Sequence, residues 1–165
     1  MSEHPRIADI PGLLTLLLER GVEFILVGGA AAVVHGVPVG TQDIDIVHSR
    51  SDENVARLGR VLGELDAFFR ADLSGRKLPP TTQHLSGRGQ LLLSTSLGPV
   101  DLLCTLHDGR GHPELLPHTV QLDLGGKVLR VLDIATLVEV KTAAGRPKDK
   151  VVVEQLVQLM NRKVE

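Results

Sequence analysis

The spacing of hydrophobic residues predicts two long helices in the first half of the chain. Leucines crowd residues 7–20, and Gly21 follows them as a typical stop signal. Residues 52–65 carry apolar side chains at intervals of three and four, and the preceding Ser51 is a favoured N-cap residue. Each stretch is therefore expected to bury one face in a common core.

Three further helices are expected from turn and capping signals. A helix over 133–144 would begin at an aspartate cap and end at Gly145. A last helix over 147–161 would begin with a proline, which is favoured at the first helical position. A short helix of small apolar residues is predicted at 30–35, directly after a pair of glycines.

Runs of β-favouring residues and strict alternation predict six strands. They are residues 22–27, 43–47, 90–95, 100–103, 120–124 and 127–131. Gly125 and Gly126 are expected to join the last two strands as a tight hairpin. Residues 71–88 are rich in glycine, proline, serine and threonine, so they are predicted to be loop around weak strand material.

Together these elements predict an α+β fold, a mixed β-sheet with helices packed on it, in a single domain over residues 1–165. Strands 22–27, 43–47 and 100–103 are expected to be neighbours in the sheet. That arrangement brings the aspartates of the latter two strands to one site while their apolar neighbours face the core.

The composition is that of an ordinary globular protein. Hydrophobic residues make up 42% and charged residues 23% of the 165. The apolar runs are far shorter than the roughly 18–20 residues of a membrane span, and the first residues do not resemble a secretory leader. Cys104 is the only cysteine, which excludes an intrachain disulfide. We therefore expect an intracellular, cytoplasmic protein with no membrane partner.

The charge balance argues against tight binding of long nucleic acids. Eighteen basic and twenty acidic residues give a formal net charge of −2, whereas proteins that bind a long phosphate backbone are usually more basic. Aromatic residues are 2% of the chain, so it has few side chains on which bases could stack.

Three aspartates form the most informative pattern. Asp43 and Asp45 are two positions apart in a predicted strand, so their side chains point to the same side, with Cα atoms roughly 7 Å apart. Asp101 stands in another short strand among apolar neighbours. Carboxylate oxygens without nitrogen or sulfur partners are ligands that suit Mg²⁺ or Mn²⁺. The alternative without a function is that each of these residues is a solvated acid at a strand edge.

Gly28 and Gly29 lie between the predicted strand 22–27 and the predicted helix 30–35. Glycines at a helix N-terminus let an anion approach free backbone N–H groups without obstruction by a Cβ atom. Alone, the pair is most simply a tight turn. Beside metal-binding carboxylates it is the equipment of phosphoryl or nucleotidyl transfer.

The order of the glycine pair, the Asp-Ile-Asp-Ile segment at 43–46 and Asp101 resembles a known family. It is similar to the nucleotidyltransferases of the DNA polymerase β-like superfamily, in their minimal bacterial form. The group that includes the nucleotidyltransferase toxins of bacterial toxin–antitoxin pairs is the most similar. Its members often carry a threonine two positions before the first aspartate, as Thr41 stands here.

Members of that group also carry a late lysine followed by Arg-x-Lys-Asp, which Lys141 and the segment 146–149 match. The resemblance, which covers nearly the whole chain, implies a nucleotidyltransferase fold with a metal site of Asp43, Asp45 and Asp101. It implies a nucleotide-binding set of Gly28, Gly29, Thr41, Lys141, Arg146 and Lys148. From the sequence alone, Lys141 could equally be a partly buried lysine that extends to solvent, and the segment 146–149 an ordinary helix start.

The resemblance implies a transfer of a nucleoside monophosphate from an NTP to an acceptor hydroxyl, with release of pyrophosphate. Two bound Mg²⁺ or Mn²⁺ ions would be shared by the aspartates. Transfer RNA, a protein side chain and a small hydroxylated molecule are all acceptors in the superfamily, and an antitoxin protein is a further candidate partner.

Two positions depart from the family pattern. Gly29 stands where many relatives have a phosphate-binding serine, and Val39 stands where relatives often have arginine. These departures favour an alternative, a catalytically degenerate module of the same fold that binds a nucleotide or a protein. The three aspartates favour the enzyme. Metal-dependent phosphoester hydrolysis by the same acids is a third interpretation.

Overall fold

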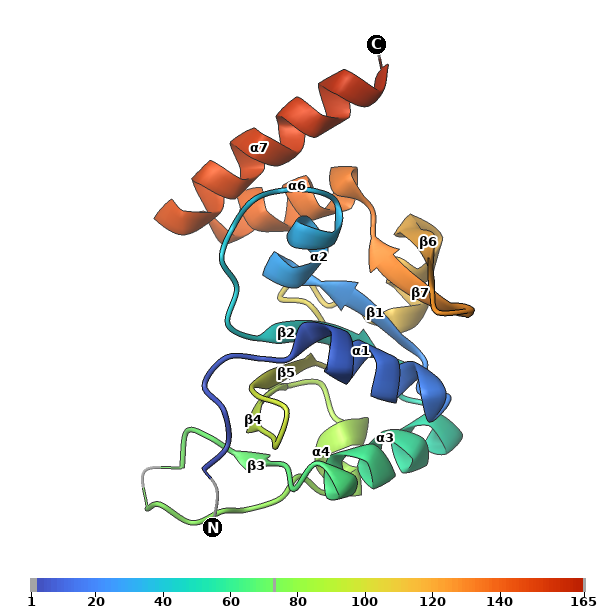
Figure 1. Cartoon of the computed structure of the whole chain (residues 1–165), viewed down its shortest axis with the longest axis vertical. Coiled ribbons are helices and arrows are strands. Elements are labelled where there is room, and N and C mark those ends of the chain that lie inside the picture. The colour runs from blue at the N-terminus through green and yellow to red at the C-terminus, as the bar shows by residue number, and fades with distance from the viewer. Residues whose placement is uncertain (1–2, 73, 165) are drawn as a thin grey trace.

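The structure, a computed structural model, describes residues 3–72 and 74–164 and is built around a seven-stranded sheet in the order β3-β4-β5-β2-β1-β7-β6 (Figure 1). The strands are β1 (Phe24–Val27), β2 (Ile44–His48), β3 (Phe68–Phe69), β4 (Gln90–Ser94), β5 (Val100–Leu103), β6 (Thr119–Leu124) and β7 (Lys127–Leu132). The helices are α1 (Ile10–Glu19), α2 (Gly28–Val34), α3 (Asp52–Glu64), α4 (Thr82–Ser86), α5 (His112–Leu115), α6 (Ile134–Ala144) and α7 (Pro147–Val164), with a 3₁₀ turn at Leu116–His118.

The sheet is mixed, as the sequence predicts. In its centre β2 is antiparallel to β1 and parallel to β5, and β1 is parallel to β7. The hairpins β4–β5 and β6–β7 extend the two sides of the sheet. The predicted neighbourhood of β1, β2 and β5 is therefore confirmed.

Helices lie at both ends of the molecule's long axis. Figure 1 shows α6 and α7 at one end and α3 and α4 at the other, with the sheet between them. Helix α2 contacts β1, β2 and α6, whereas α1 contacts β7 and α3. In the part of the chain that the structure describes, no helix combines the length and the apolar character that a membrane crossing needs.

The core explains why β2 can hold acidic side chains in place. Ile44 and Ile46 have no exposed surface and alternate with Asp45, which is half-buried on the other face of the strand. All of β1 is buried. Burial of one branched side chain contributes roughly 1.5–3 kcal/mol, so the backbone that carries the aspartate is firmly fixed.

Local signals set most element ends where the sequence predicts them. The Ser51 hydroxyl accepts from the backbone N–H of Asn54 at 3.3 Å, and the Asp133 carboxylate accepts from that of Thr136 at 2.7 Å. Gly145 ends α6 with a left-handed φ of 66°. Pro147 begins α7, and the two-glycine turn joins β6 to β7.

The segment 71–88 differs from the prediction, because it contains α4. The backbone N–H of Thr81 donates to Nδ1 of His84 at 2.9 Å, and the Thr81 hydroxyl accepts from the backbone N–H of His84 at 3.3 Å. This reciprocal cap starts the helix. A histidine fills the position where glutamate or glutamine usually signals such a cap.

Two elements near the site begin at other residues than predicted. Helix α2 starts at Gly28 and therefore includes both glycines, whereas the prediction began at residue 30. Strand β2 starts at Ile44, so Asp43 lies just before it. The pairing of β1 with β2 ends at Val27 and Asp45, and the Thr41 hydroxyl donates to the Asp43 carbonyl at 2.9 Å.

Candidate functional site

Asp43, Asp45 and Asp101 come together at the centre of the sheet. Asp45 and Asp101 are directly paired in the parallel register of β2 and β5, which places their side chains side by side. One carboxylate oxygen from each of the three residues lies within 4.8 Å of the other two. All three side chains are half-buried. Three converging oxygen ligands fit a hard divalent cation such as Mg²⁺ or Mn²⁺.

The electrostatics of the cluster also fit a cation. Burial, together with the charges of Asp101 and Asp43, raises the pKa of Asp45 to about 7. Burial raises the pKa of Asp101 as well, although the guanidinium of Arg70 opposes that rise. Like charges at this distance keep protons on the cluster near neutral pH, and a divalent cation would displace them.

Arg70 is a member of the site that the sequence did not indicate. It follows β3, and its Nη2 donates to Oδ1 of Asp101 and lies 3.6 Å from Oδ2 of Asp43. Its Nη1 donates to the Leu93 carbonyl at 2.7 Å. A lone arginine after Phe68-Phe69 has no recognisable spacing to the aspartates, so only the fold could reveal this contact.

The glycine turn packs directly against the acids. Gly28 has a left-handed φ of 68°, and a Cβ atom there would collide with the Asp45 carboxylate. Glycine is therefore required at this position both by the backbone and by the space available. At Gly29 the backbone is ordinary, and a Cβ atom would lie 3.2 Å from Oγ1 of Thr41. The first turn of α2 thus lies beside the acids.

Lys141 and the start of α7 meet around a buried carboxylate. Asp149 is 2% exposed, and its Oδ2 accepts from Nε of Arg146 at 2.7 Å. Its Oδ1 lies 3.6 Å from Nζ of Lys141, which is itself 9% exposed. Although burial raises the pKa of Asp149, the hydrogen bond and charge of Arg146 hold it below its usual value. The acid thus fixes two of the predicted nucleotide-binding residues.

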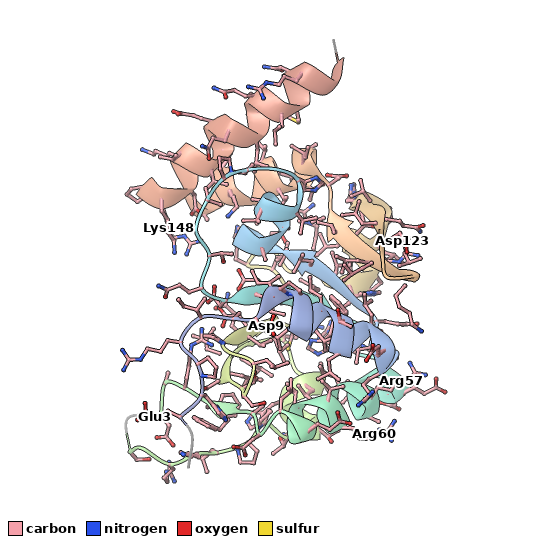
Figure 2. All side chains as sticks on the ribbon, in the orientation of Figure 1. Glu3, Asp9, Arg57, Arg60, Asp123 and Lys148 are labelled. Carbon is pink, nitrogen blue, oxygen red and sulfur yellow. The ribbon has the colours of Figure 1, made fainter. Side chains whose placement is uncertain are left out.

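A cleft of about 1270 Å³ connects these groups. The three aspartates, both glycines and Thr41 line it, and so do Lys141, Arg146 and Lys148. Figure 2 shows Lys148 at the first turn of α7. The structure therefore brings every sequence-predicted site residue to one cleft. Its volume exceeds the roughly 300–1,000 Å³ of a typical ligand pocket, so two substrates have room.

No protein-family model and no curated protein sequence matches the chain. Solved structures do. A lincomycin-bound lincosamide antibiotic adenylyltransferase, LnuA, superposes with a TM-score of 0.64 at 13% identity, covering 94% of this chain and 99% of that one. A Thermotoga maritima protein, provisionally assigned as a nucleotidyltransferase, superposes with a TM-score of 0.52 at 19% identity, covering 98% and 99%. The chain has the nucleotidyltransferase fold.

Proposed function

We propose that the chain is a metal-dependent nucleotidyltransferase, which transfers a nucleoside monophosphate from an NTP to an acceptor hydroxyl. The observation that carries this proposal is the convergence of three carboxylates from two adjacent strands beside a glycine turn. If the acids had only a structural role, the neighbouring helix start and the basic residues would have no part in it. Nucleotidyl transfer uses all of them.

Asp43, Asp45 and Asp101 would hold Mg²⁺ or Mn²⁺ in this proposal. When bound as a pair of ions at these residues, the metal would supply positive charge for the triphosphate and would acidify the acceptor hydroxyl. Asp101 is the carboxylate that we assign to accept the proton of that hydroxyl. The Asp101 side chain is 14% exposed and lines the cleft.

The triphosphate would bind between the glycine turn and the start of α7. The backbone N–H groups of Gly28 and Gly29 lie in the first turn of α2, which the Val27 side chain does not cap, and an anion is favoured at such a position. Lys141, Arg146 and Lys148 face the same cleft and supply positive charge. The Thr41 hydroxyl donates a hydrogen bond to the backbone carbonyl of Asp43, and in this way Thr41 orients Asp43.

The acceptor side of the cleft supports a small hydroxylated molecule. Leu103 is two positions after Asp101 on the same face of β5, and Leu106, His107 and Gln90 line the cleft beside it. Leu103 and Leu106 are apolar and Gln90 is uncharged, whereas Lys141 lies in α6, Lys148 in α7 and Arg146 in the link between these two helices. A polyanion such as RNA finds little to bind there. LnuA, with a similar fold, was solved with the small antibiotic lincomycin bound.

Label transfer from an α-phosphate-labelled NTP tests the activity. The parent chain should label an acceptor in the presence of Mg²⁺ or Mn²⁺, and Asp45→Asn should lower the rate at least about a hundredfold by removing a ligand charge. Asp123→Asn, at an exposed position near the end of β6, is the matched control and should label normally. Equal rates for Asp45→Asn and the parent would exclude the proposed metal site.

The acceptor is tested with the same label. Small hydroxylated antibiotics, transfer RNA and protein are offered separately, and label on the small molecules supports the acceptor class that we propose. Label on RNA or protein would exclude a small-molecule acceptor and would indicate a toxin-like activity, which the sequence resemblance favours. In that case expression should arrest growth, and a partner antitoxin should relieve the arrest.

The alternative of a degenerate binding module is supported by two departures from the family pattern, Gly29 in place of a serine and Val39 in place of an arginine. It predicts NTP binding without transfer to any acceptor. Calorimetry of NTP binding beside the label-transfer assay separates the two functions.

A further inference from the structure

Arg70 occupies a defined position against the acidic cluster. Its guanidinium reaches two of the three aspartates, Asp101 by a hydrogen bond and Asp43 at 3.6 Å. It does not contact Asp45. The remaining side of the cluster faces the glycine turn and the cleft.

The position of Arg70 is fixed by backbone as well as by charge. Its N–H donates to the Leu92 carbonyl at 3.1 Å, and its Nη1 donates to the Leu93 carbonyl at 2.7 Å. Both carbonyls belong to β4, which pairs with the strand that carries Asp101. The side chain is 30% exposed. An ordinary surface ion pair has no such anchors and is typically worth little.

We propose that Arg70 is an internal counter-ion, which holds Asp43 and Asp101 in place before a divalent metal binds and then gives up Asp43 to the metal. The inference rests on the metal site of the proposed function. A guanidinium carries one positive charge and donates hydrogen bonds, whereas Mg²⁺ or Mn²⁺ carries two charges and accepts oxygen ligands directly. The divalent ion can therefore displace Arg70 from the Asp43 carboxylate, and a monovalent ion such as Na⁺ has no such advantage.

A direct consequence is that Arg70 lowers the affinity of the aspartate cluster for the divalent metal. The metal must compete with a positive charge already close to two of its ligands. Removal of that charge should tighten metal binding. It should also destabilise the metal-free chain, because three neighbouring carboxylates would then lack a counter-charge.

Mn²⁺ titration of the full chain without nucleotide, followed by electron paramagnetic resonance, tests the inference. Arg70→Met keeps the length of the side chain and removes its charge, and should bind Mn²⁺ about fivefold to tenfold more tightly than the parent. Arg70→Lys keeps a charge but loses the fork of donors, and should fall between the two. Arg110→Met is the matched control, since Arg110 also contacts two carboxylates, Asp108 and Glu139, outside the cluster.

The outcomes separate the two proposals. Unchanged or weaker Mn²⁺ binding by folded Arg70→Met would overturn the inference and leave the metal site standing. If that variant does not fold, Arg70→Lys decides: tighter binding than the parent supports the inference, and equal or weaker binding rejects it. If Asp45→Asn binds Mn²⁺ as tightly as the parent, the proposed metal site itself is wrong. A tightening in Arg110→Met equal to that in Arg70→Met would also overturn the inference.

Discussion

At the scale of single residues, Asp45 couples the charge of the site to the stability of the fold. Its pKa is raised from the usual value near 4 to about 7 by burial and by its two acidic neighbours. Between these values the folded state binds more protons than the unfolded state. The contribution of Asp45 to the stability of the metal-free chain is therefore greatest at low pH and falls as the pH rises from about 4 to 7.

We expect Asp45→Asn to remove this loss. The variant resembles the protonated aspartate, so at pH 8 in EDTA its melting temperature should exceed that of the parent by about 2–4 °C for each kcal/mol gained, and the rise of the pKa to about 7 bounds the gain at about 4 kcal/mol. At pH 4, close to the pKa of an aspartate in the unfolded chain, the difference should nearly vanish. Thermal unfolding followed by circular dichroism measures both, and an equal difference at the two pH values would contradict the assignment.

Gly28 and Gly29 are adjacent but have different surroundings, so the loss of stability on substitution by alanine can be compared between them. Gly28→Ala must place a Cβ atom at positive φ against the Asp45 carboxylate, and should cost more than about 1 kcal/mol of stability. Gly29→Ala meets only Oγ1 of Thr41 at 3.2 Å, so its cost should be smaller. Urea denaturation of the two variants gives the comparison, and similar losses would place the strain elsewhere.

At the scale of elements, the junction of α6 and α7 depends on a buried ion pair. Removing one partner of such a pair leaves the other buried without compensation, which typically costs about 3–5 kcal/mol. Lys141 retains some exposure, so Asp149→Asn should cost about 2–3 kcal/mol. Adding Lys141→Met should recover part of the loss. Chemical denaturation of the single and double variants measures the coupling, and additive losses would show that the two side chains act independently.

The sequence predicts the elements well where local chemistry decides them. The caps at Ser51 and Asp133 and the glycine hairpin act through residues a few positions apart, and each lies where it is predicted. Helix α4 was missed because His84 replaces the usual capping acid. Strand β3 is too short to show a periodicity, and it exists through its pairing with β4.

The sequence predicts part of the candidate site, again where the residues lie a few positions apart in the chain. The aspartates and the glycine turn lie in short motifs, so the sequence indicated them and the register of β2 and β5 brings them together. Arg70 reaches the cluster through β3–β4 pairing, a tertiary contact with no sequence signal. Asp149 stood at the end of a recognised segment, but only the packing of α7 on α6 places it beside Lys141.

At the scale of the whole molecule, metal binding should stabilise the fold in a pH-dependent way. Mg²⁺ at saturating concentration should raise the melting temperature, because a ligand that binds only the folded state stabilises it. The rise should be larger at pH 8 than at pH 5.5, since protons occupy the cluster below the raised pKa of Asp45. Thermal shift against MgCl₂ at the two pH values measures this. A larger rise at pH 5.5 would place the metal elsewhere.

The parallel pairing of Asp45 with Asp101 also bears on the order of events during folding. The whole of α3, β3, α4 and β4 lies between the two residues in the chain, so their strands meet only after a large loop has closed. A complete set of ligands does not exist until this long-range contact has formed. A divalent ion should therefore slow unfolding much more than it speeds refolding, and in cells it would prolong the lifetime of the native chain without helping to make it.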